Sequence, residues 1–313
     1  MAKILVTGGA GFIGSHVVDR LVNDGHSIVV LDNLSTGFKG QVNKRAKFTT
    51  ADIKNLNEIK EHFNGIEFVF HLAARARIQP SIKDPEPTFY DNIIGTLNVL
   101  IASRDAGIKR VIYSASSSSY GDQETFPLRE EMQSRFKNPY ALSKYVGEKT
   151  CELFSKIYGL ETVSLRYFNV YGPRQLTEGA YATVVGIFLK QLLEKKPLTI
   201  VSPGTIRRDF THVSDVVEAN ILAMKSKKVG KGEVINIGCG KNYSINEVAS
   251  LILSKAKPQV RLAGADFLKK PHVVYIPKLP GESKITLAFN KKAQELLGWQ
   301  PKISFKDGIS QLF

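Results

Sequence analysis

Residues 4–14 read Ile-Leu-Val-Thr-Gly-Gly-Ala-Gly-Phe-Ile-Gly, and they carry the clearest structural signal in the chain. The apolar run at residues 4–6 is typical of a buried strand, and residues 12–22 follow with helical spacing. The glycines therefore lie where a first strand turns into a first helix. Glycine suits this turn because the chain bends tightly and the helix must pack closely on the strand. The stretch predicts the opening unit of a doubly wound sheet.

The same turn is suited to the pyrophosphate of a dinucleotide. A helix N-terminus offers free backbone amides and the positive end of a dipole, and glycine lets the backbone approach phosphate closely. A second predicted strand, residues 27–32, ends in Asp32, eighteen residues after Gly14, where its carboxylate would meet the adenosine ribose hydroxyls. This acid favours NAD over NADP. The alternative, a glycine-rich turn without a ligand, is disfavoured because strand, turn, helix and acid agree.

Composition narrows the class of protein. The 313 residues suffice for one large or two medium domains with a substantial core. Cys151 and Cys239 lie far apart and form no CxxC pair or cysteine and histidine cluster, so we expect neither a disulfide framework nor a zinc site. No leader precedes the first predicted strand, and no apolar run is long enough to cross a bilayer. We expect a soluble protein of the reducing cytoplasm, without a membrane partner.

The formal net charge of +14 raises nucleic acid as a partner. The lysines are scattered, however, and groups such as Lys195-Lys196 fall at predicted helix ends and loops, where cations complement the helix dipole. No basic face interleaved with aromatic residues and no known recognition module is evident. We therefore expect no nucleic-acid partner. We interpret the charge as solvated surface, part of which favours an anionic small substrate.

Runs typical of strands alternate with stretches of helical spacing as far as residue 167. The alternation predicts an α/β fold with a Rossmann-type doubly wound parallel sheet. Beyond residue 167 the pattern loosens, which indicates a smaller C-terminal substrate lobe interleaved with the sheet. We predict a dinucleotide-binding domain at residues 1–167, joined by parts of 208–238, and a second lobe from residues 168–207 and 239–313. The predicted strands are 3–7, 27–32, 48–52, 68–71, 110–116 and 161–167; the helices between them are 11–24, 56–63, 87–106 and 138–158.

Tyr140 and Lys144 form a Tyr-x-x-x-Lys pair, a pattern that occurs again at residues 145–149, so position must decide. Asn138 and the following proline form a good helix start, which places Tyr140 in the first turn and Lys144 on the same face. A free tyrosine has a pKa of about 10 and is a poor base unless cations stabilise its phenolate. Lys144, the nicotinamide charge and the helix end would do so. Tyr145 is rotated off this face, and we assign it to packing.

The alternative for this pair is a buried aromatic ring beside a lysine that pairs with Glu148. Ser116 is a third candidate, because it ends the predicted strand 110–116 at the edge where doubly wound sheets bind ligands. We expect it to hydrogen-bond the substrate hydroxyl, although a run of four serines also suits a polar loop. His71 ends a strand too, but no second histidine or acid stands at metal spacing. We interpret it as a satisfied core residue and predict no metal site.

With these residues established, the chain resembles an extended short-chain dehydrogenase/reductase of the NAD-dependent epimerase/dehydratase family, most closely the UDP-glucose 4-epimerases and related nucleotide-sugar epimerases. The similarity covers nearly the whole length. It runs through TGGAGFIGSH at residues 7–16, LDNLSTG at 31–37, HLAA at 71–74, LRYFNVYGPR at 165–174 and RDFTHV at 208–213. The resemblance implies NAD as cofactor, with contacts from Gly8, Gly11, Phe12, Ile13, Gly14, Asp32, Asn33, Asp52, Ile53, Ala73 and Lys144. For a UDP-sugar substrate it implies Ser116, Ser117, Tyr140, Asn169, Arg208 and Thr286, with Asn169 and Arg208 on the diphosphate.

The resemblance also favours one reaction. Related dehydratases and decarboxylases carry an acid just before the Tyr-Gly that corresponds to residues 120–121, whereas this chain has Ser117 and Ser118. Elimination of water then lacks its proton donor. We therefore expect a 4-epimerase that oxidises C4 transiently, lets the 4-keto sugar turn and returns the hydride. The alternatives are another NAD-dependent nucleotide-sugar enzyme (a UDP-glucuronate epimerase, a dehydratase or a reductase) and, more distantly, a catalytically silent NAD-binding interaction protein.

Two departures from the family concern the substrate. The family's Arg-x-Gly-Asp/Glu segment is Leu279-Pro-Gly-Glu here, so a diphosphate arginine is missing, and Lys278 could replace it only as a point charge. The family's later Ala-Asp is Ala288-Phe289. In the relatives, the residue five positions beyond the glycine that corresponds to Gly281 borders the sugar C2 substituent. The small Thr286 at this place predicts room for N-acetylamino sugars as well as glucose and galactose.

The predicted helix after the fourth strand carries more apolar positions than one buried face requires: Phe89, Ile93, Leu97 and Leu100/Ile101. Relatives pair this helix with the helix that carries Tyr140. We therefore predict a homodimer with a four-helix interface.

Overall fold

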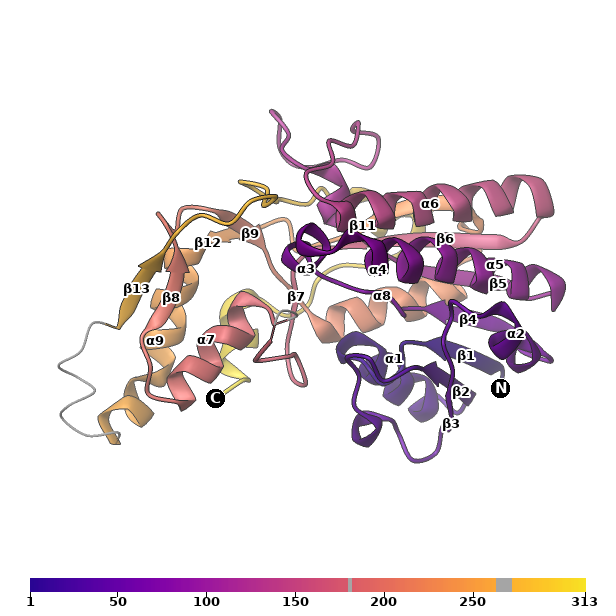
Figure 1. The fold of residues 1–313 in the computed structure, drawn as a ribbon, viewed down its shortest axis with the longest axis horizontal. Helices are drawn as coiled ribbons and strands as arrows, with labels where there is room; N and C mark the ends of the chain where they lie inside the picture. Colours follow the sequence, from indigo (N-terminus) through magenta and orange to yellow (C-terminus); the bar gives the residue numbers. More distant parts are fainter. Residues whose placement is uncertain (180–181, 263–271) are drawn as a thin grey trace.

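A seven-stranded parallel sheet forms the core of the larger lobe, at the right of Figure 1. The computed structural model describes residues 1–179, 182–262 and 272–313. The strands lie in the order β11-β6-β5-β4-β1-β2-β3, and every adjacent pair is parallel. The predicted fold class is confirmed. The bounds are β1 (Lys3–Thr7), β2 (Ser27–Asp32), β3 (Lys47–Thr50), β4 (Phe68–His71), β5 (Arg110–Ser116), β6 (Glu161–Tyr167) and β11 (Lys231–Ile237).

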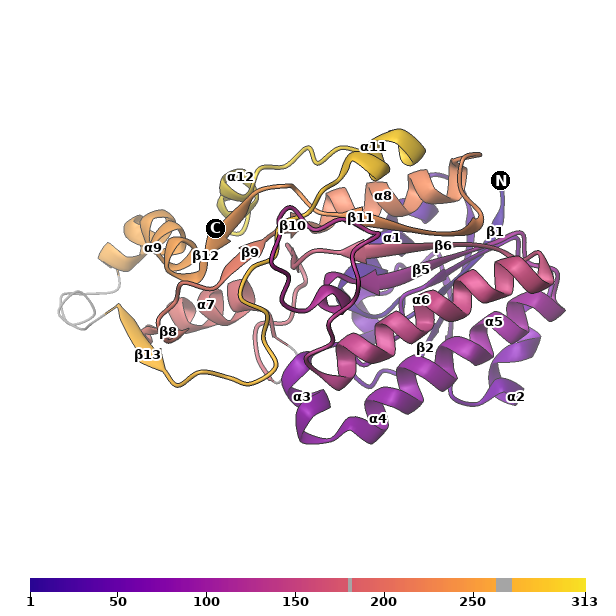
Figure 2. The ribbon, with the colours of Figure 1, turned by 90° about the horizontal axis from the view of Figure 1, so that it is seen from above.

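Helices cover both faces of this sheet, which is seen almost edge-on in Figure 2. One face is packed by α1 (Phe12–Asn23), α8 (Val213–Lys225) and α11 (Lys291–Leu297), and the other by α2 (Leu56–Ile59), α5 (Gly95–Asp105) and α6 (Pro139–Tyr158). Each face has its own cluster of buried hydrophobic side chains. Strand order reverses beside β1, so β1 and β4 flank the crevice where such sheets bind ligands. Among the described residues, no helix combines the length and apolar character needed to cross a membrane.

The helix predicted at residues 87–106 is present as one continuous helical stretch over residues 85–105, whose type changes along its length. It comprises α4 (Pro85–Phe89), a π-helical turn η3 (Tyr90–Ile94) and α5, and α3 (Ile78–Lys83) precedes them. Pro85 explains the earlier start, because proline suits the first helical position and holds the residue before it extended. Asp84 has φ −147° and ψ 96° accordingly. The helix predicted at residues 56–63 likewise divides into α2 and the 3₁₀ turn η2 (Lys60–Phe63).

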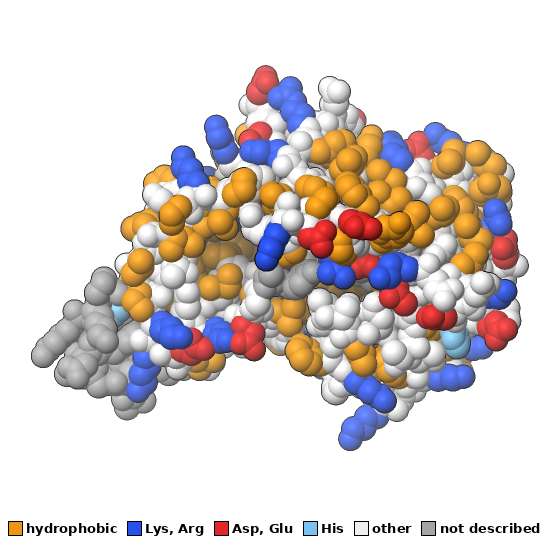
Figure 3. Space-filling view, in the orientation of Figure 1, with side chains coloured by type: hydrophobic (Ala, Val, Ile, Leu, Met, Phe, Trp, Pro, Cys, Tyr) orange, Lys and Arg blue, Asp and Glu red, His pale blue; other side chains and the backbone are white. Residues whose placement is uncertain are grey.

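The second lobe has a separate core, and the surface between the lobes is hollowed (Figure 3). Its buried side chains include Phe188, Ile200 and Phe305. We had expected all of residues 239–313 to belong to this lobe. Part of this range does not, because α11 and Trp299 pack into the core of the sheet half. The remaining elements are β7 (Val170–Tyr171), α7 (Val184–Leu193), β8 (Leu198–Val201), β9 (Arg207–Asp209), β10 (Thr211–His212), β12 (Asn242–Ser244), α9 (Ile245–Leu262), β13 (Val273–Ile276), α12 (Phe305–Ser310), and the 3₁₀ turns η1 (Lys39–Gln41) and η4 (Ser117–Tyr120).

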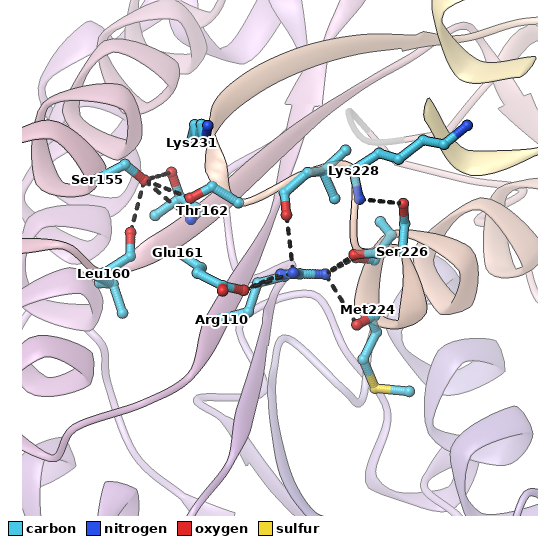
Figure 4. Close-up of polar contacts among 12 residues, drawn as sticks. Arg110, Ser155, Leu160, Glu161, Thr162, Met224, Ser226, Lys228 and Lys231 are labelled. Carbon is cyan, nitrogen blue, oxygen red and sulfur yellow. Dashed lines mark hydrogen bonds and ion pairs between the residues drawn. The ribbon is translucent and has the colours of Figure 1, made fainter. Parts of the chain in front are cut away.

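Arg110, at the start of β5, ties the end of α8 to the sheet (Figure 4). Its Nη1 donates to the carbonyl oxygens of Ala223, Met224 and Ser226 at 2.7–3.1 Å, and its Nη2 donates to that of Val229 at 2.9 Å. Its Nε donates to Glu161 at 2.8 Å. The last carbonyl oxygens of a helix have no hydrogen-bond donors within the helix. Here the buried guanidinium of Arg110 supplies those donors.

Candidate active site

A cavity of about 730 Å³ lies at the carboxyl edge of the sheet and continues into the second lobe. Its walls come from both lobes. Every residue predicted above for the catalytic, cofactor and substrate sites is among its lining residues, from Gly8 at the first turn to Thr286 in the second lobe. The fold therefore gathers into one space residues that are up to 278 positions apart in the chain.

The glycine turn is built as the sequence indicates. Gly8 has φ +72°, and a Cβ there would lie 2.5 Å from the backbone nitrogen of Ala73. A Cβ on Gly14 would lie 2.1 Å from the carbonyl oxygen of Gly8. Gly11 caps α1 without a side-chain hydrogen bond, so the first amides of this helix are open to an anion at the cavity wall.

Two carboxylates border the same end of the cavity. Asp32 ends β2, and its carboxylate accepts hydrogen bonds from the backbone amides of Ala10 (3.0 Å) and Leu34 (2.8 Å). Asp52 accepts one from the Asn33 side chain at 3.2 Å. Asp32 thus holds the glycine turn as well as facing the cavity. Acids in this place suit ribose hydroxyls and repel an additional phosphate.

Tyr140 occupies the first turn of α6, as predicted from the helix start. The Asn138 side chain accepts a hydrogen bond from the Ala141 amide at 2.8 Å and caps the helix. Ser116, at the end of β5, lines the cavity beside Tyr140. Burial raises the pKa of Tyr140, and the nearby Ser116 hydroxyl and the positive charge of Arg77 oppose this rise. The positive charge that acts on the Tyr140 phenol in the structure is that of Arg77, and the stabilising role that we expected for Lys144, together with the nicotinamide charge and the helix end, stays a prediction.

Lys144 is buried, and its ammonium lies 4.3 Å from the centre of the Tyr113 ring. Burial lowers its pKa to about 7, against the opposing effects of Cys151 and Glu148. Glu148 forms no ion pair with Lys144, because both of its oxygens accept from Arg166, at 2.9 and 2.7 Å. The alternative of a Lys144–Glu148 pair is therefore wrong.

Two other predicted assignments concern residues near this centre. The ring of Tyr145 packs against Phe136 with centroids 5.0 Å apart, as expected of a packing residue. Both ring nitrogens of His71 lie beside hydroxyls, Nδ1 at 2.7 Å from Thr7 and Nε2 at 3.0 Å from Thr96. Burial lowers the pKa of His71 to about 3, so the ring is neutral. His71 is a satisfied core residue, and no group of potential metal ligands occurs within the described ranges.

The second lobe supplies the wall opposite the cofactor end. Arg208 donates through Nη2 to Glu282 at 2.9 Å and through Nη1 to the Ser283 carbonyl at 2.7 Å. The Asn169 amide donates to the Asp209 carbonyl at 2.9 Å and to the Thr286 hydroxyl at 3.1 Å. Thr286 is buried and also accepts from the Asp209 amide at 3.1 Å. Asn169 and Thr286 thus form part of a fixed network at the cavity wall.

The sequence interpretation missed several lining residues, chiefly Arg77, Gln79 and Glu282. Arg77 precedes α3 with φ +135°, a conformation that L-residues adopt rarely and that occurs at functional sites. The sequence has no signal that singles it out, because Arg75 stands in the same stretch after His71 and only Arg77 lines the cavity. Lys278 is exposed and is not among the cavity-lining residues, whereas Leu279 is. Lys278 therefore does not take the place of the missing arginine.

Comparisons with known proteins agree with this geometry. The model of the NAD dependent epimerase/dehydratase family matches residues 4–238. A UDP-glucose 4-epimerase of Mycolicibacterium smegmatis is 35% identical over 317 residues, which span 99% of this chain and 96% of the relative. A UDP-glucuronate 4-epimerase of Thermodesulfobacterium geofontis is 33% identical over 325 residues, 99% of this chain and 95% of the relative.

Solved structures give the same result. The UDP-glucose 4-epimerase of Thermotoga maritima, with UDP-glucose, superimposes with a TM-score of 0.91 at 38% identity, covering 99% of this chain and 96% of that one. The UDP-N-acetylglucosamine 4-epimerase of Methanobrevibacter ruminantium gives 0.89 at 32% identity, with coverages of 99% and 96%. With the fold, the cavity and these relatives in agreement, the chain belongs to the NAD dependent epimerase/dehydratase family, within its UDP-sugar 4-epimerases.

Proposed function

We propose that the chain interconverts UDP-glucose and UDP-galactose by transient oxidation at C4. The observation that carries this proposal is the Ser116–Tyr140 pair at the carboxyl edge of the sheet, in a cavity that continues to Arg208. The pair suits proton transfer at a sugar hydroxyl, and Arg208 suits a diphosphate. The cavity thus offers one place for the reacting carbon and another for the nucleotide.

The cofactor end fits NAD. Its uncapped helix N-terminus suits a pyrophosphate, and Asp32 suits ribose hydroxyls. When bound, NAD supplies the hydride acceptor for oxidation and the hydride donor for reduction. The residues that we propose to hold it are Gly8, Gly11, Phe12, Ile13, Gly14, Asp32, Asn33, Asp52, Ile53, Ala73 and Lys144.

Tyr140 acts as the base in this proposal. It accepts the proton of the 4-hydroxyl as hydride leaves C4, while Ser116 hydrogen-bonds the same oxygen. The 4-keto sugar turns over, hydride returns to its opposite face, and Tyr140 gives the proton back. The positive charge of Arg77 favours the phenolate form of Tyr140. Arg208 holds the diphosphate meanwhile, whereas both side-chain amide hydrogens of Asn169, which we had also expected there, are engaged by Asp209 and Thr286.

The serine turn favours epimerisation over elimination. Residues 117–119 carry hydroxyls only, and the Ser118 hydroxyl lies 2.8 Å from that of Ser116. No carboxylic acid stands where a dehydratase needs its proton donor. The serine turn therefore supplies no proton donor for the loss of water from the oxidised sugar.

Two substrate variants have specific support. Arg77 places a cation on the cavity wall near Tyr140, which would suit a uronic acid carboxylate, so a UDP-glucuronate 4-epimerase is the second candidate. The small Thr286 leaves space at the opposite wall for an N-acetylamino group, so we propose that UDP-N-acetylglucosamine and UDP-N-acetylgalactosamine are accepted too.

We also propose a homodimer through α4 to α6. Leu100 is buried in the core, so it cannot contribute as we had expected. Exposed apolar side chains nevertheless gather over these helices (Figure 3): Tyr90, Ile94, Leu142, Leu153 and Ile157. Such a surface is typical of an interface between copies. Sedimentation of micromolar protein as a monomer alone would contradict the dimer.

Incubation with UDP-, GDP- and dTDP-hexoses, followed by chromatographic separation of the epimers, tests the proposed function. We expect UDP-glucose and UDP-galactose to reach the same equilibrium mixture from either side. Inclusion of UDP-glucuronate ranks the second candidate in the same assay. Absence of any 4-epimer product from the whole panel would refute the proposal.

A further inference from the structure

Arg208 is held from behind by a segment of the second lobe. Its Nη1 donates to the carbonyl oxygens of Ser283 and Arg207, and one Nη2 hydrogen goes to the Glu282 carboxylate. A guanidinium has five N–H donors. Within the described part of the chain these contacts use three, which leaves the Nε–H and one Nη2–H for a ligand in the cavity. Glu282 and Ser283 thus orient Arg208.

The same segment is bonded to the start of the helix that carries Tyr140. The Lys137 ammonium donates to the Glu282 carbonyl at 2.9 Å, and the Asn138 amide donates to the Gly281 carbonyl at 3.0 Å. Asn138 is also the cap of α6. Lys137 and Asn138, which precede Tyr140, therefore bind Gly281 and Glu282, and Glu282 is the partner of Arg208.

A third residue closes this arrangement. Asp122 accepts a hydrogen bond from Lys137 and, through its other oxygen, one from the Lys284 amide at 2.8 Å. Gly281 fits closely between these elements, because its φ is +76° and a Cβ there would lie 2.5 Å from Ile82 of α3. We name the set of Asp122, Lys137, Asn138, Gly281, Glu282 and Ser283 the brace.

We propose that the brace sets the separation between the diphosphate-binding Arg208 and the base Tyr140, so that the sugar C4 meets Tyr140 when the diphosphate meets Arg208. This inference rests on the proposed function. Asp122 and Lys137 are positioning residues in it, because they touch neither end of the substrate. Misplacement of a reacting group by about 1 Å can cost about a hundredfold in rate, so a loosened brace lowers turnover while the nucleotide still binds.

The test separates anchoring from positioning. Lys137→Met keeps the alkyl stem but removes the hydrogen bonds to Asp122 and to the Glu282 carbonyl. Glu282 and Ser283 still hold Arg208 in this variant. We expect kcat for UDP-galactose to fall about tenfold or more, with the Kd of UDP, measured by calorimetry, within about twofold of wild type. Lys137→Arg should restore most of kcat, and Asp122→Asn should lower kcat without adding to the effect of Lys137→Met.

Arg135 and Glu124 supply a matched control, since they form an exposed ion pair in the same loop that does not touch the brace. Arg135→Met should leave kcat unchanged. The Lys137–Asp122 pair is itself one-third exposed, so Lys137→Met should shift the melting temperature by only about 2 °C. A folded Lys137→Met with wild-type kcat, or with equal losses in kcat and UDP affinity, would overturn the brace. Absence of turnover by the wild-type enzyme would instead refute the proposed function and this inference together.

Discussion

The two walls of the cavity are constructed differently. The cofactor wall consists mainly of backbone: the glycine turn, the uncapped start of α1 and the ends of parallel strands. The substrate wall consists of side chains that hold one another, such as Asn169 with Thr286 and Arg208 with Glu282. The first wall depends on local chain geometry, and a single Cβ would block it. The second can change one side chain at a time, as Leu279 illustrates, which stands where the resemblance to the family predicts an arginine.

Arginines make the same contrast. The donors of Arg110 go to backbone carbonyls and Glu161, and its side chain is buried away from the cavity. Arg208 keeps two donors and lines the cavity. A buried arginine with every donor engaged serves the fold, whereas one with donors left over at a cavity serves a ligand.

The largest expected effect tests the catalytic end of the cavity. Tyr140→Phe removes the proton acceptor, so kcat should fall by about a thousandfold or more while fold and NAD content persist. Tyr145→Phe, which alters only a ring packed on Phe136, should stay within about twofold of wild type. Steady-state kinetics and the absorbance of released cofactor measure both. Equal losses in the two variants would reverse our choice between the overlapping motifs.

Replacing each of the two arginines should separate binding from folding. Arg208→Met should raise KM for UDP-galactose about a hundredfold and leave the melting temperature nearly unchanged. Arg110→Met leaves several buried carbonyls without a donor and should lower the free energy of unfolding by about 3 kcal/mol, with kcat/KM preserved in the folded fraction. Thermal unfolding and kinetics on the same samples measure both. Loss of stability in both variants would abolish the distinction drawn above.

Thr286→Tyr tests how freely the substrate wall can change. A bulky ring should lower kcat/KM for the N-acetylamino sugars by about tenfold to a hundredfold through steric exclusion, with a smaller loss for UDP-glucose and UDP-galactose. Competition between UDP-galactose and UDP-N-acetylgalactosamine in one mixture measures the ratio directly. Thr286→Ser keeps the hydroxyl that binds Asn169 and Asp209 and is the matched control. An unchanged ratio in Thr286→Tyr would show that position 286 does not border the sugar.

Arg77→Gly should change kcat least of these variants. It tests whether Arg77 supports the base Tyr140. Glycine adopts φ +135° readily, so the variant should relieve the backbone strain at this position. Loss of the cation removes one of the two influences that lower the pKa of Tyr140, so that pKa rises. A base works when deprotonated, and the rising limb of the kcat profile should therefore move to higher pH. An unmoved limb would exclude Arg77 from the support of Tyr140.

Local signals accounted for most of the sheet and for the catalytic helix. Five of the six predicted strands have the observed bounds, because each is a short run rich in apolar residues that the fold buries. Asn138 and Pro139 identified the start of α6, which decided between Tyr140 and Tyr145. Pro85 could have corrected the predicted start of the next-longest helix, but the π-helical turn after it has no comparable signature.

The substrate wall was less accessible to sequence reasoning, because its contacts join distant residues. Lys137 meets Glu282 across 145 positions, and Arg208 meets it across 74. The pairing of Glu148 with Arg166 rather than Lys144 likewise depends on strand β6 lying beside α6, whereas spacing along the helix suggested Lys144. Arg77 was overlooked because its role depends on an uncommon φ, which no residue type announces.

The place of Trp299 has a consequence for synthesis of the protein. This side chain is packed in the same apolar cluster as Ile4 and Val6, and its indole donates to the Asp215 carbonyl at 2.8 Å. A chain emerges from the ribosome N-terminus first, so the opening strand waits for a residue 295 positions beyond Ile4 before its face of the sheet is sealed. During translation the glycine turn can form early, yet the face of the sheet beneath it is completed only after residue 299 has left the ribosome.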